Sequence, residues 1–135
     1  MIGIVIVAHG GLAKEYLAAM EHVIGKQPGT KAIQIGAECD RNERRKVILD
    51  AIDEVDTGYG VVVVTDMFGG TPSNLALSAC TNGSRRVVYG ANLPLLIKLG
   101  KLRNKPLNDA VEEAITAARK YINCADTVVA GKDRV

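Results

Sequence analysis

The stretch Ile2-Gly3-Ile4-Val5-Ile6-Val7-Ala8-His9-Gly10-Gly11 passes from an unbroken aliphatic segment into a histidine and two glycines. Such a segment, with no polar position, predicts a β-strand buried on both faces, as in the centre of a parallel sheet. A helical pattern begins near Leu12. His9 therefore lies where a central strand gives way to a helix, at the edge where open α/β sheets bind their ligands. The alternative is a polar residue that simply ends a strand.

Strand-like and helix-like segments alternate along the rest of the chain. The expected strands are 2–8, 31–35, 60–66 and 86–89, with a possible last strand at 126–130. The expected helices begin at Leu12, Asp40, Thr71, Leu93 and Pro106, and Asp40 has Glu43 at capping-box spacing. Alternation of this kind predicts a doubly wound α/β fold, in which helices cover both faces of a mainly parallel sheet. We expect one domain over residues 1–135 with the common strand order 2-1-3-4.

Asp66 ends the third expected strand, in which four consecutive valines leave no polar face. In the order 2-1-3-4 the first and third strands are neighbours, so His9 and Asp66 should lie side by side. A carboxylate bonded to one imidazole nitrogen fixes the tautomer and leaves a lone pair on the other nitrogen. The pair thus suits a nucleophile, a general base or a metal ligand.

The loop Gly69-Gly70-Thr71-Pro72-Ser73-Asn74 leads into the next helix. Glycine N–H groups and a helix N-terminus can hold a phosphoryl group, and two hydroxyls lie among them. We therefore expect phosphate-binding residues at Gly10, Gly69, Gly70, Thr71 and Ser73. The helix is expected to have Thr71 as its N-cap and Pro72 at N1, and the alternative is a well-capped helix with no ligand. With the catalytic pair His9 and Asp66, the loop favours nucleophilic phosphoryl transfer.

Composition excludes several classes of function. A net charge of +2 is too small for a nucleic-acid-binding protein, and no apolar run approaches the roughly 20 residues of a membrane span. Three widely spaced cysteines without a CxxC predict neither a disulfide framework nor a zinc site. We expect a cytoplasmic protein with no metal and no cofactor. The basic run Arg41, Arg44, Arg45 and Lys46 is expected to be the solvated face of its helix, with a docking patch as the alternative. Tyr89 is expected to pack under the fourth strand.

Three segments carry a resemblance to a known family: Val7-Ala8-His9-Gly10, Thr65 to Asn74, and Gly90-Ala91-Asn92-Leu93-Pro94-Leu95-Leu96. Together they resemble the IIA domain of the mannose-type bacterial phosphotransferase system. The resemblance implies that the phosphocarrier HPr phosphorylates His9 and that Asp66 bonds the opposite ring nitrogen. It also implies that Thr71 lies near the phosphate, that the Asn92–Pro94 loop borders the site, and that homodimers form through a swapped terminal strand.

The expected function is therefore that of a phosphotransferase with a phosphohistidine intermediate. No IIB domain follows within residues 1–135, so the phosphoryl group is expected to pass to a separate IIB component or to act as a signal for a regulatory protein. Two alternatives remain from the residues. One is a receiver-like signalling module phosphorylated on Asp66, and the other is a chelatase-like enzyme that binds metal through His9.

Overall fold

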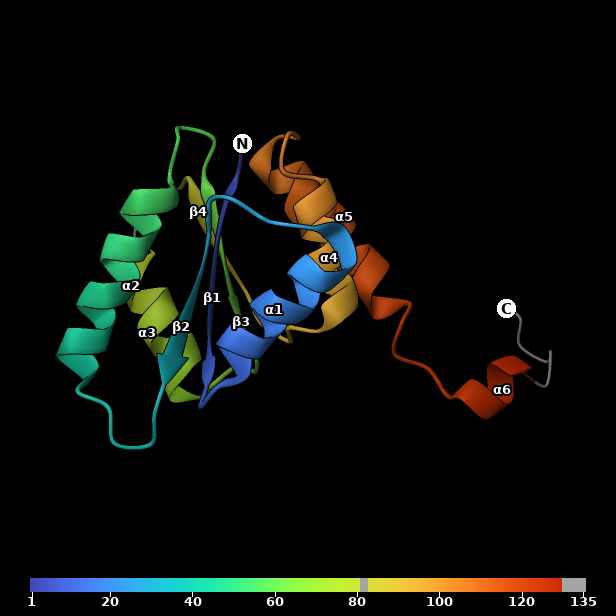
Figure 1. Cartoon of the computed structure of the whole chain (residues 1–135), viewed down its shortest axis with the longest axis horizontal. Coiled ribbons are helices and arrows are strands. Elements are labelled where there is room, and N and C mark those ends of the chain that lie inside the picture. The colour runs from blue at the N-terminus through green and yellow to red at the C-terminus, as the bar shows by residue number, and fades with distance from the viewer. Residues whose placement is uncertain (81–82, 130–135) are drawn as a thin grey trace.

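The computed structural model describes residues 1–80 and 83–129, in which strands and helices alternate as predicted (Figure 1). In chain order the elements are β1 (Gly3–His9), α1 (Leu12–Ile24), β2 (Thr30–Ile35), α2 (Arg41–Val55), β3 (Val61–Thr65), α3 (Thr71–Ala79), β4 (Arg85–Val88), α4 (Leu93–Lys101), α5 (Leu107–Arg119) and α6 (Ala125–Val129). The ends of the four strands differ from the predicted ends by about one residue.

The strands form one parallel sheet in the predicted order β2-β1-β3-β4. β1 lies in the middle, where Ile6 is opposite Ala32 of β2 and Val5 is opposite Val63 of β3. All of β3 is buried, and so is β1 up to Ala8. The carboxyl ends of β1 and β3 therefore emerge next to each other from the core.

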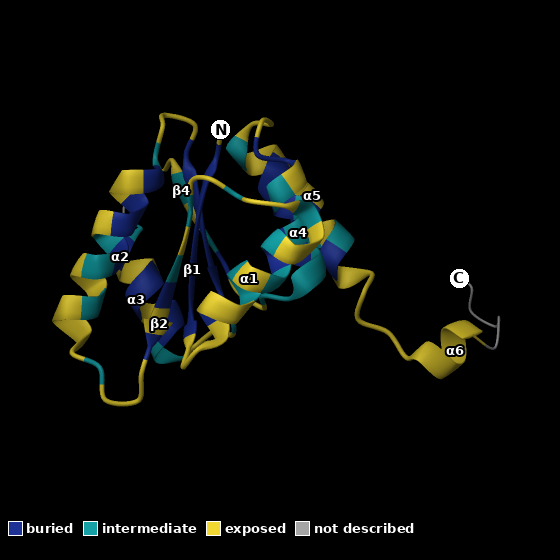
Figure 2. Cartoon of the chain, in the orientation of Figure 1, coloured by how far each residue is buried: buried dark blue, intermediate teal, exposed yellow. Residues whose placement is uncertain are grey.

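Helices cover both faces of the sheet. Alternate residues of β1 point to opposite faces: Ile4 and Ile6 pack with α1, α4 and α5, whereas Val5 and Val7 pack with α2 and α3. Figure 2 shows the buried sides of these helices turned toward the sheet. In the part of the chain that the structure describes, no helix combines the length and apolar character needed to cross a bilayer.

Helix α2 begins where the sequence predicts, at the carboxyl edge of the sheet. The Asp40 side chain accepts hydrogen bonds from the backbone N–H groups of Asn42 and Glu43. The Glu43 carboxylate accepts a hydrogen bond from Arg44 Nε at 2.6 Å. In a capping box it would instead turn back to the backbone N–H of the N-cap residue. This cap places Arg41 in the first turn of α2, close to the loop that follows β2.

The expected last strand is wrong for residues 126–129, which belong to the short helix α6; Ala130 lies outside the described residues. The Val128 N–H donates to the Cys124 carbonyl, which is a helical bond. A strand needs a neighbouring strand to share its backbone bonds, and Figure 1 shows α6 far from both edges of the sheet. Since no residue of α6 is buried, local helical bonds satisfy its backbone instead.

Candidate functional site

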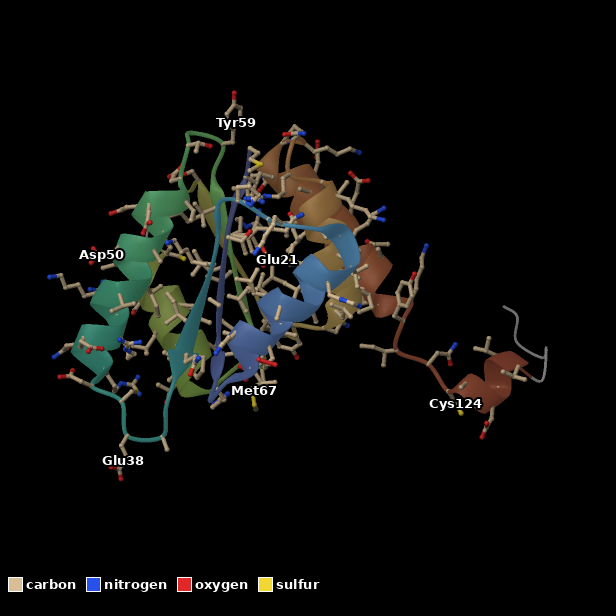
Figure 3. The ribbon with its side chains drawn as sticks, in the orientation of Figure 1. Glu21, Glu38, Asp50, Tyr59, Met67 and Cys124 are labelled. Carbon is tan, nitrogen blue, oxygen red and sulfur yellow. The ribbon has the colours of Figure 1, made fainter. Side chains whose placement is uncertain are left out.

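The candidate site lies at the carboxyl edge of the sheet. In Figure 3, Met67 (after β3) and Glu38 (after β2) lie at the same end of the molecule, whereas Tyr59, before β3, lies at the other end. His9 is the last residue of β1, and Asp66 directly follows β3. The sheet order thus brings these two residues together although they are 57 positions apart in the sequence.

His9 and Asp66 are in direct contact, as the strand order predicts. Oδ2 of Asp66 lies 2.7 Å from the His9 ring nitrogen Nδ1, and it also accepts the His9 backbone N–H at 3.0 Å. An ionised carboxylate can only accept hydrogen bonds. The ring of His9 must therefore carry a proton on Nδ1, which leaves Nε2 with a free lone pair when the imidazole is neutral.

The environment keeps the Asp66 carboxyl ionised. Burial raises its pKa, but hydrogen bonds from the His9 ring and backbone, its charge interaction with His9, and the Met67 N–H bond to Oδ1 outweigh burial, so the pKa lies below its usual value. The two side chains differ in exposure, since 47% of the His9 side chain is accessible and 11% of that of Asp66. The imidazole is therefore open to solvent, whereas the carboxylate bonded to it is largely shielded.

Gly70 lets the next loop approach the free side of the ring. A Cβ atom at this position would lie 2.9 Å from His9 Cε1 and 3.1 Å from Nε2, which is closer than carbon normally comes to either atom. Its φ of −89° is open to any residue, so the requirement for glycine here is steric. The lone pair on Nε2 thus faces the segment that begins α3.

The start of α3 differs from the prediction by one residue. Gly70, in an extended conformation, is the N-cap, so Thr71 is the first helical residue and Pro72 the second. The prediction of Thr71 as N-cap is wrong, because the glycine backbone already makes the turn into the helix. As a result, the Thr71 hydroxyl is not used for capping, and it lines a cavity together with His9.

Of the other residues predicted to bind phosphate, Gly10 lines the same cavity as Thr71. The Gly10 N–H donates to the Ile35 carbonyl, so that donor is already used in joining β1 to β2. Gly69 adopts a φ of +92°, which favours glycine, in the turn before α3. Ser73 is 1% exposed, and its hydroxyl has no hydrogen-bond partner among the described residues.

Arg41 is a residue of this site that the sequence analysis assigned to a solvated helix face. Its Nη1 donates to Thr71 Oγ1 at 3.5 Å. A cavity of about 390 Å³ is lined by Arg41, Thr71 and His9, together with the loop after β2. The strand order could have identified Arg41 from the sequence. Because β2 neighbours β1 in the parallel sheet, the helix that follows β2 begins at the same edge of the sheet as His9.

Exposed apolar side chains directly follow Asp66 in the chain. Met67 and Phe68 follow Asp66 and are more than half exposed, and the Phe68 ring lies 5.1 Å from that of Tyr89. The expectation that Tyr89 packs under β4 is therefore wrong: it lies one residue past the strand and is 60% exposed. Asn92 caps α4 through a bond from the Leu95 N–H, which shapes the neighbouring loop.

This chain is similar in sequence to known proteins. The family model for fructose IIA components of the phosphotransferase system (EIIA-man) matches residues 3–118. A protein of Escherichia coli strain K12, YadI, which is named as a candidate phosphotransferase enzyme IIA component, is 30% identical over 116 residues, covering 85% of this chain and 80% of its own.

Solved structures agree with that match. The IIA protein associated with the fucose utilization operon of Streptococcus pneumoniae has a TM-score of 0.84 at 27% identity, covering 94% of this chain and 95% of that one. The component EIIA of Streptococcus agalactiae has a TM-score of 0.82 at 28% identity, covering 94% and 99%.

The Asp66 contact predicts the tautomer of His9. We expect neutral His9 to be protonated on Nδ1 because the carboxylate accepts a hydrogen bond from that N–H. Two-bond ¹H–¹⁵N NMR of the ring at mildly alkaline pH distinguishes the two tautomers, with His22 on the exposed face of α1 as an internal reference. In Asp66→Ala the proton should move mainly to Nε2. An unchanged His9 pattern in that variant would show that Asp66 does not select the tautomer.

Proposed function

Because this chain belongs to the fructose and mannose type of IIA components of the phosphotransferase system, we propose that it is a phosphocarrier whose phosphoryl group is bound to Nε2 of His9. The observation that carries this proposal is the orientation of the imidazole. Asp66 accepts a hydrogen bond from Nδ1, which leaves the lone pair on Nε2 free. Nε2 lies next to Gly70, at the start of α3. A ring held in this way is a nucleophile with one reactive atom.

The proposed reaction is a direct exchange of one phosphoryl group. The Nε2 lone pair attacks phosphorus in phosphorylated HPr, and a bond between nitrogen and phosphorus forms. The bond between phosphorus and the donor atom breaks, and its electron pair returns to HPr. No proton has to leave His9, because the attacking nitrogen carries none. Catalysis of this kind depends mainly on positioning and on charge stabilisation.

Asp66 supplies the charge stabilisation in this proposal. When Nε2 bonds to phosphorus, the ring gains positive charge, and the carboxylate 2.7 Å from Nδ1 lies where that charge is most effectively offset. The phosphoryl oxygens would lie over the first turn of α3. The first N–H groups of a helix have no partner within the helix, and the helix dipole places positive potential there. Gly70, Thr71 and the preceding Gly69 would thus form the phosphate-binding segment.

The proposed partners follow from the family. HPr is the donor, and the acceptor is either a separate IIB component or a regulatory protein that distinguishes the phosphorylated form. Phosphorylation adds roughly −1.5 to −2 charges, and here it would do so beside the exposed side chains of Met67 and Phe68. A change of that size beside an apolar border alters which partner docks. The cytoplasm is the compartment that this role requires.

Neither alternative from the sequence is retained. A receiver-like module would phosphorylate Asp66, yet both oxygens of that carboxylate already accept hydrogen bonds from His9 and Met67. A chelatase-like site would need further ligands beside His9, and no group of three or more such side chains is found in residues 1–80 and 83–129. The family match over residues 3–118 favours the phosphocarrier over both.

The roles of His9 and Asp66 are tested by labelling with enzyme I, HPr and radioactive phosphoenolpyruvate. We expect one acid-labile, base-stable phosphate in the wild type and in the control His22→Ala, and none in His9→Ala. Asp66→Asn keeps the shape but can offer an N–H to Nδ1 and so favour the wrong tautomer. That error costs about 10⁴-fold in serine proteases; for phosphoryl exchange we expect a loss of about 10²-fold. Full labelling of His9→Ala would refute the proposal.

The steric role of Gly70 gives a second prediction. In Gly70→Ala the new methyl group meets Cε1 and Nε2 of His9, so the ring must shift or lose access to the donor. A displacement of about 1 Å can cost on the order of 10²-fold in rate, and we expect phosphorylation to slow by about 10- to 100-fold. The matched control is Gly11→Ala, where the methyl group would meet no atom within 4 Å. Equal phosphorylation rates in the two variants would contradict the steric role.

We also propose a homodimer in which the segment after α5 packs on the partner. Tyr121 and Ile122 are 72% and 76% exposed, and α6 buries nothing against its own chain. Beside them, a groove of about 290 Å³ runs along β4 and α5. Light scattering should report a dimer at micromolar concentration and a monomer after deletion of residues 126–135. A dimer that survives the deletion would exclude this segment as the interface.

A further inference from the structure

Arg41 is a cation with no carboxylate partner in residues 1–80 and 83–129. Four basic residues are paired with carboxylates, namely Lys31, Arg44, Arg85 and Lys105, and Arg41 is among those that are not. Arg41 makes one long hydrogen bond, 3.5 Å from Nη1 to the uncharged hydroxyl of Thr71. No carboxylate among the described residues pairs with its positive charge, and its side chain lines the same cavity as the His9 ring.

The position of Arg41 in its helix is electrostatically unfavourable. It is the first residue of α2, where the helix dipole and unpaired N–H groups favour acidic side chains and disfavour cations. Asp40 at the N-cap offsets part of this cost. A residue that opposes local stability is expected chiefly where function needs it. The helix itself gives no reason for a cation here, so the reason lies in what the side chain reaches.

The side chain of Arg41 reaches the surroundings of Nε2. Gly70 lies against Nε2 of His9, Thr71 follows it, and the Thr71 hydroxyl accepts from Arg41. The same three side chains, His9, Arg41 and Thr71, line the cavity of about 390 Å³. The cavity that they share is large enough to hold a phosphoryl group.

We propose that Arg41 is a phosphoryl-binding residue: its guanidinium, which donates to Thr71 in the unphosphorylated protein, binds phosphoryl oxygens once the group is on His9. The inference rests on the proposed function of His9. A guanidinium presents several donors in a planar fork that fits phosphate oxygens, and such charged hydrogen bonds are stronger than neutral ones. The shift of Arg41 from the Thr71 hydroxyl to the dianion would also stabilise the phosphorylated form relative to phosphorylated HPr.

The first test measures the phosphorylated protein in four forms: wild type, Arg41→Lys, Arg41→Gln and Lys46→Gln. Lys46 is exposed on the same helix outside the cavity, so its variant removes the same charge without removing the contact. We expect Arg41→Gln to shift the phosphoryl equilibrium with HPr toward HPr by about tenfold, the size of one charged hydrogen bond. Arg41→Lys should recover part of this, because it keeps the charge and loses the fork, and Lys46→Gln should match the wild type.

The second test separates ligand binding from a merely structural role, and from failure of the proposed function. Inorganic phosphate is titrated into the unphosphorylated proteins, and NMR follows the Gly70 and Thr71 amides and the Arg41 Nε–H. We expect saturable shifts at all three groups in the wild type and about tenfold weaker binding in Arg41→Gln. If wild type accepts nothing from HPr, the function of His9 fails, and this titration still decides whether Arg41 binds the anion. Equal behaviour of Arg41→Gln and Lys46→Gln in both tests would overturn the inference.

Discussion

The contact between the His9 ring and the Asp66 carboxylate depends on the order of the sheet, and the rest of the site depends on that contact. The two residues are neighbours only because β1 and β3 are adjacent and parallel, so that both chains leave the core at one edge. Burying a carboxylate costs free energy unless hydrogen bonds compensate. Here the ring and the backbone N–H of His9, with the N–H of Met67, outweigh that cost, and the pKa of Asp66 falls below its usual value. The anion then selects the ring tautomer, and the tautomer determines which nitrogen is free.

A second constraint acts on the opposite side of the ring. The loop after β3 must come close enough for the start of α3 to face Nε2, and only a residue without a Cβ can occupy position 70 at that distance. Gly70 also takes the N-cap position, which releases the Thr71 hydroxyl from capping. The steric and hydrogen-bonding requirements are thus met by one residue. Without this close approach the proposed nucleophile would have the right tautomer but no helix start beside Nε2 to bind a phosphoryl group.

The sequence predicted the layers, the strand order and the His9–Asp66 contact, because these follow from hydrophobic pattern and from the rule that parallel strands end at one edge. The sequence did not predict which residue caps α3, because Gly70 and Thr71 both satisfy the local preferences of an N-cap. The choice between them depends on how closely the loop approaches His9. The sequence placed Arg41 on a solvated helix face, because a basic run on a helix has the same pattern whether or not one of its residues reaches the site. Residues 126–129 have strand-like composition, but a strand also requires a neighbour, and none lies beside them in the described chain.

Electrostatics explains why the site combines a shielded anion with an exposed cation. Before phosphorylation, Asp66 is balanced by its donors, whereas Arg41 lies at the positive end of α2 with only a hydroxyl to bind. The placement of Arg41 at the positive end of α2 is slightly unfavourable in the free protein. A dianion bound between Asp66 and Arg41 would make that placement favourable. In the proposed phosphorylated form the ring would carry positive charge against Asp66 and the phosphoryl oxygens would face α3 and the guanidinium, so each new charge would meet an opposite one already in place. Stabilisation that exists only in the charged state favours acceptance of the group over mere binding of the donor. The loops after three different strands share this task, which is why no single motif in the sequence contains the whole site.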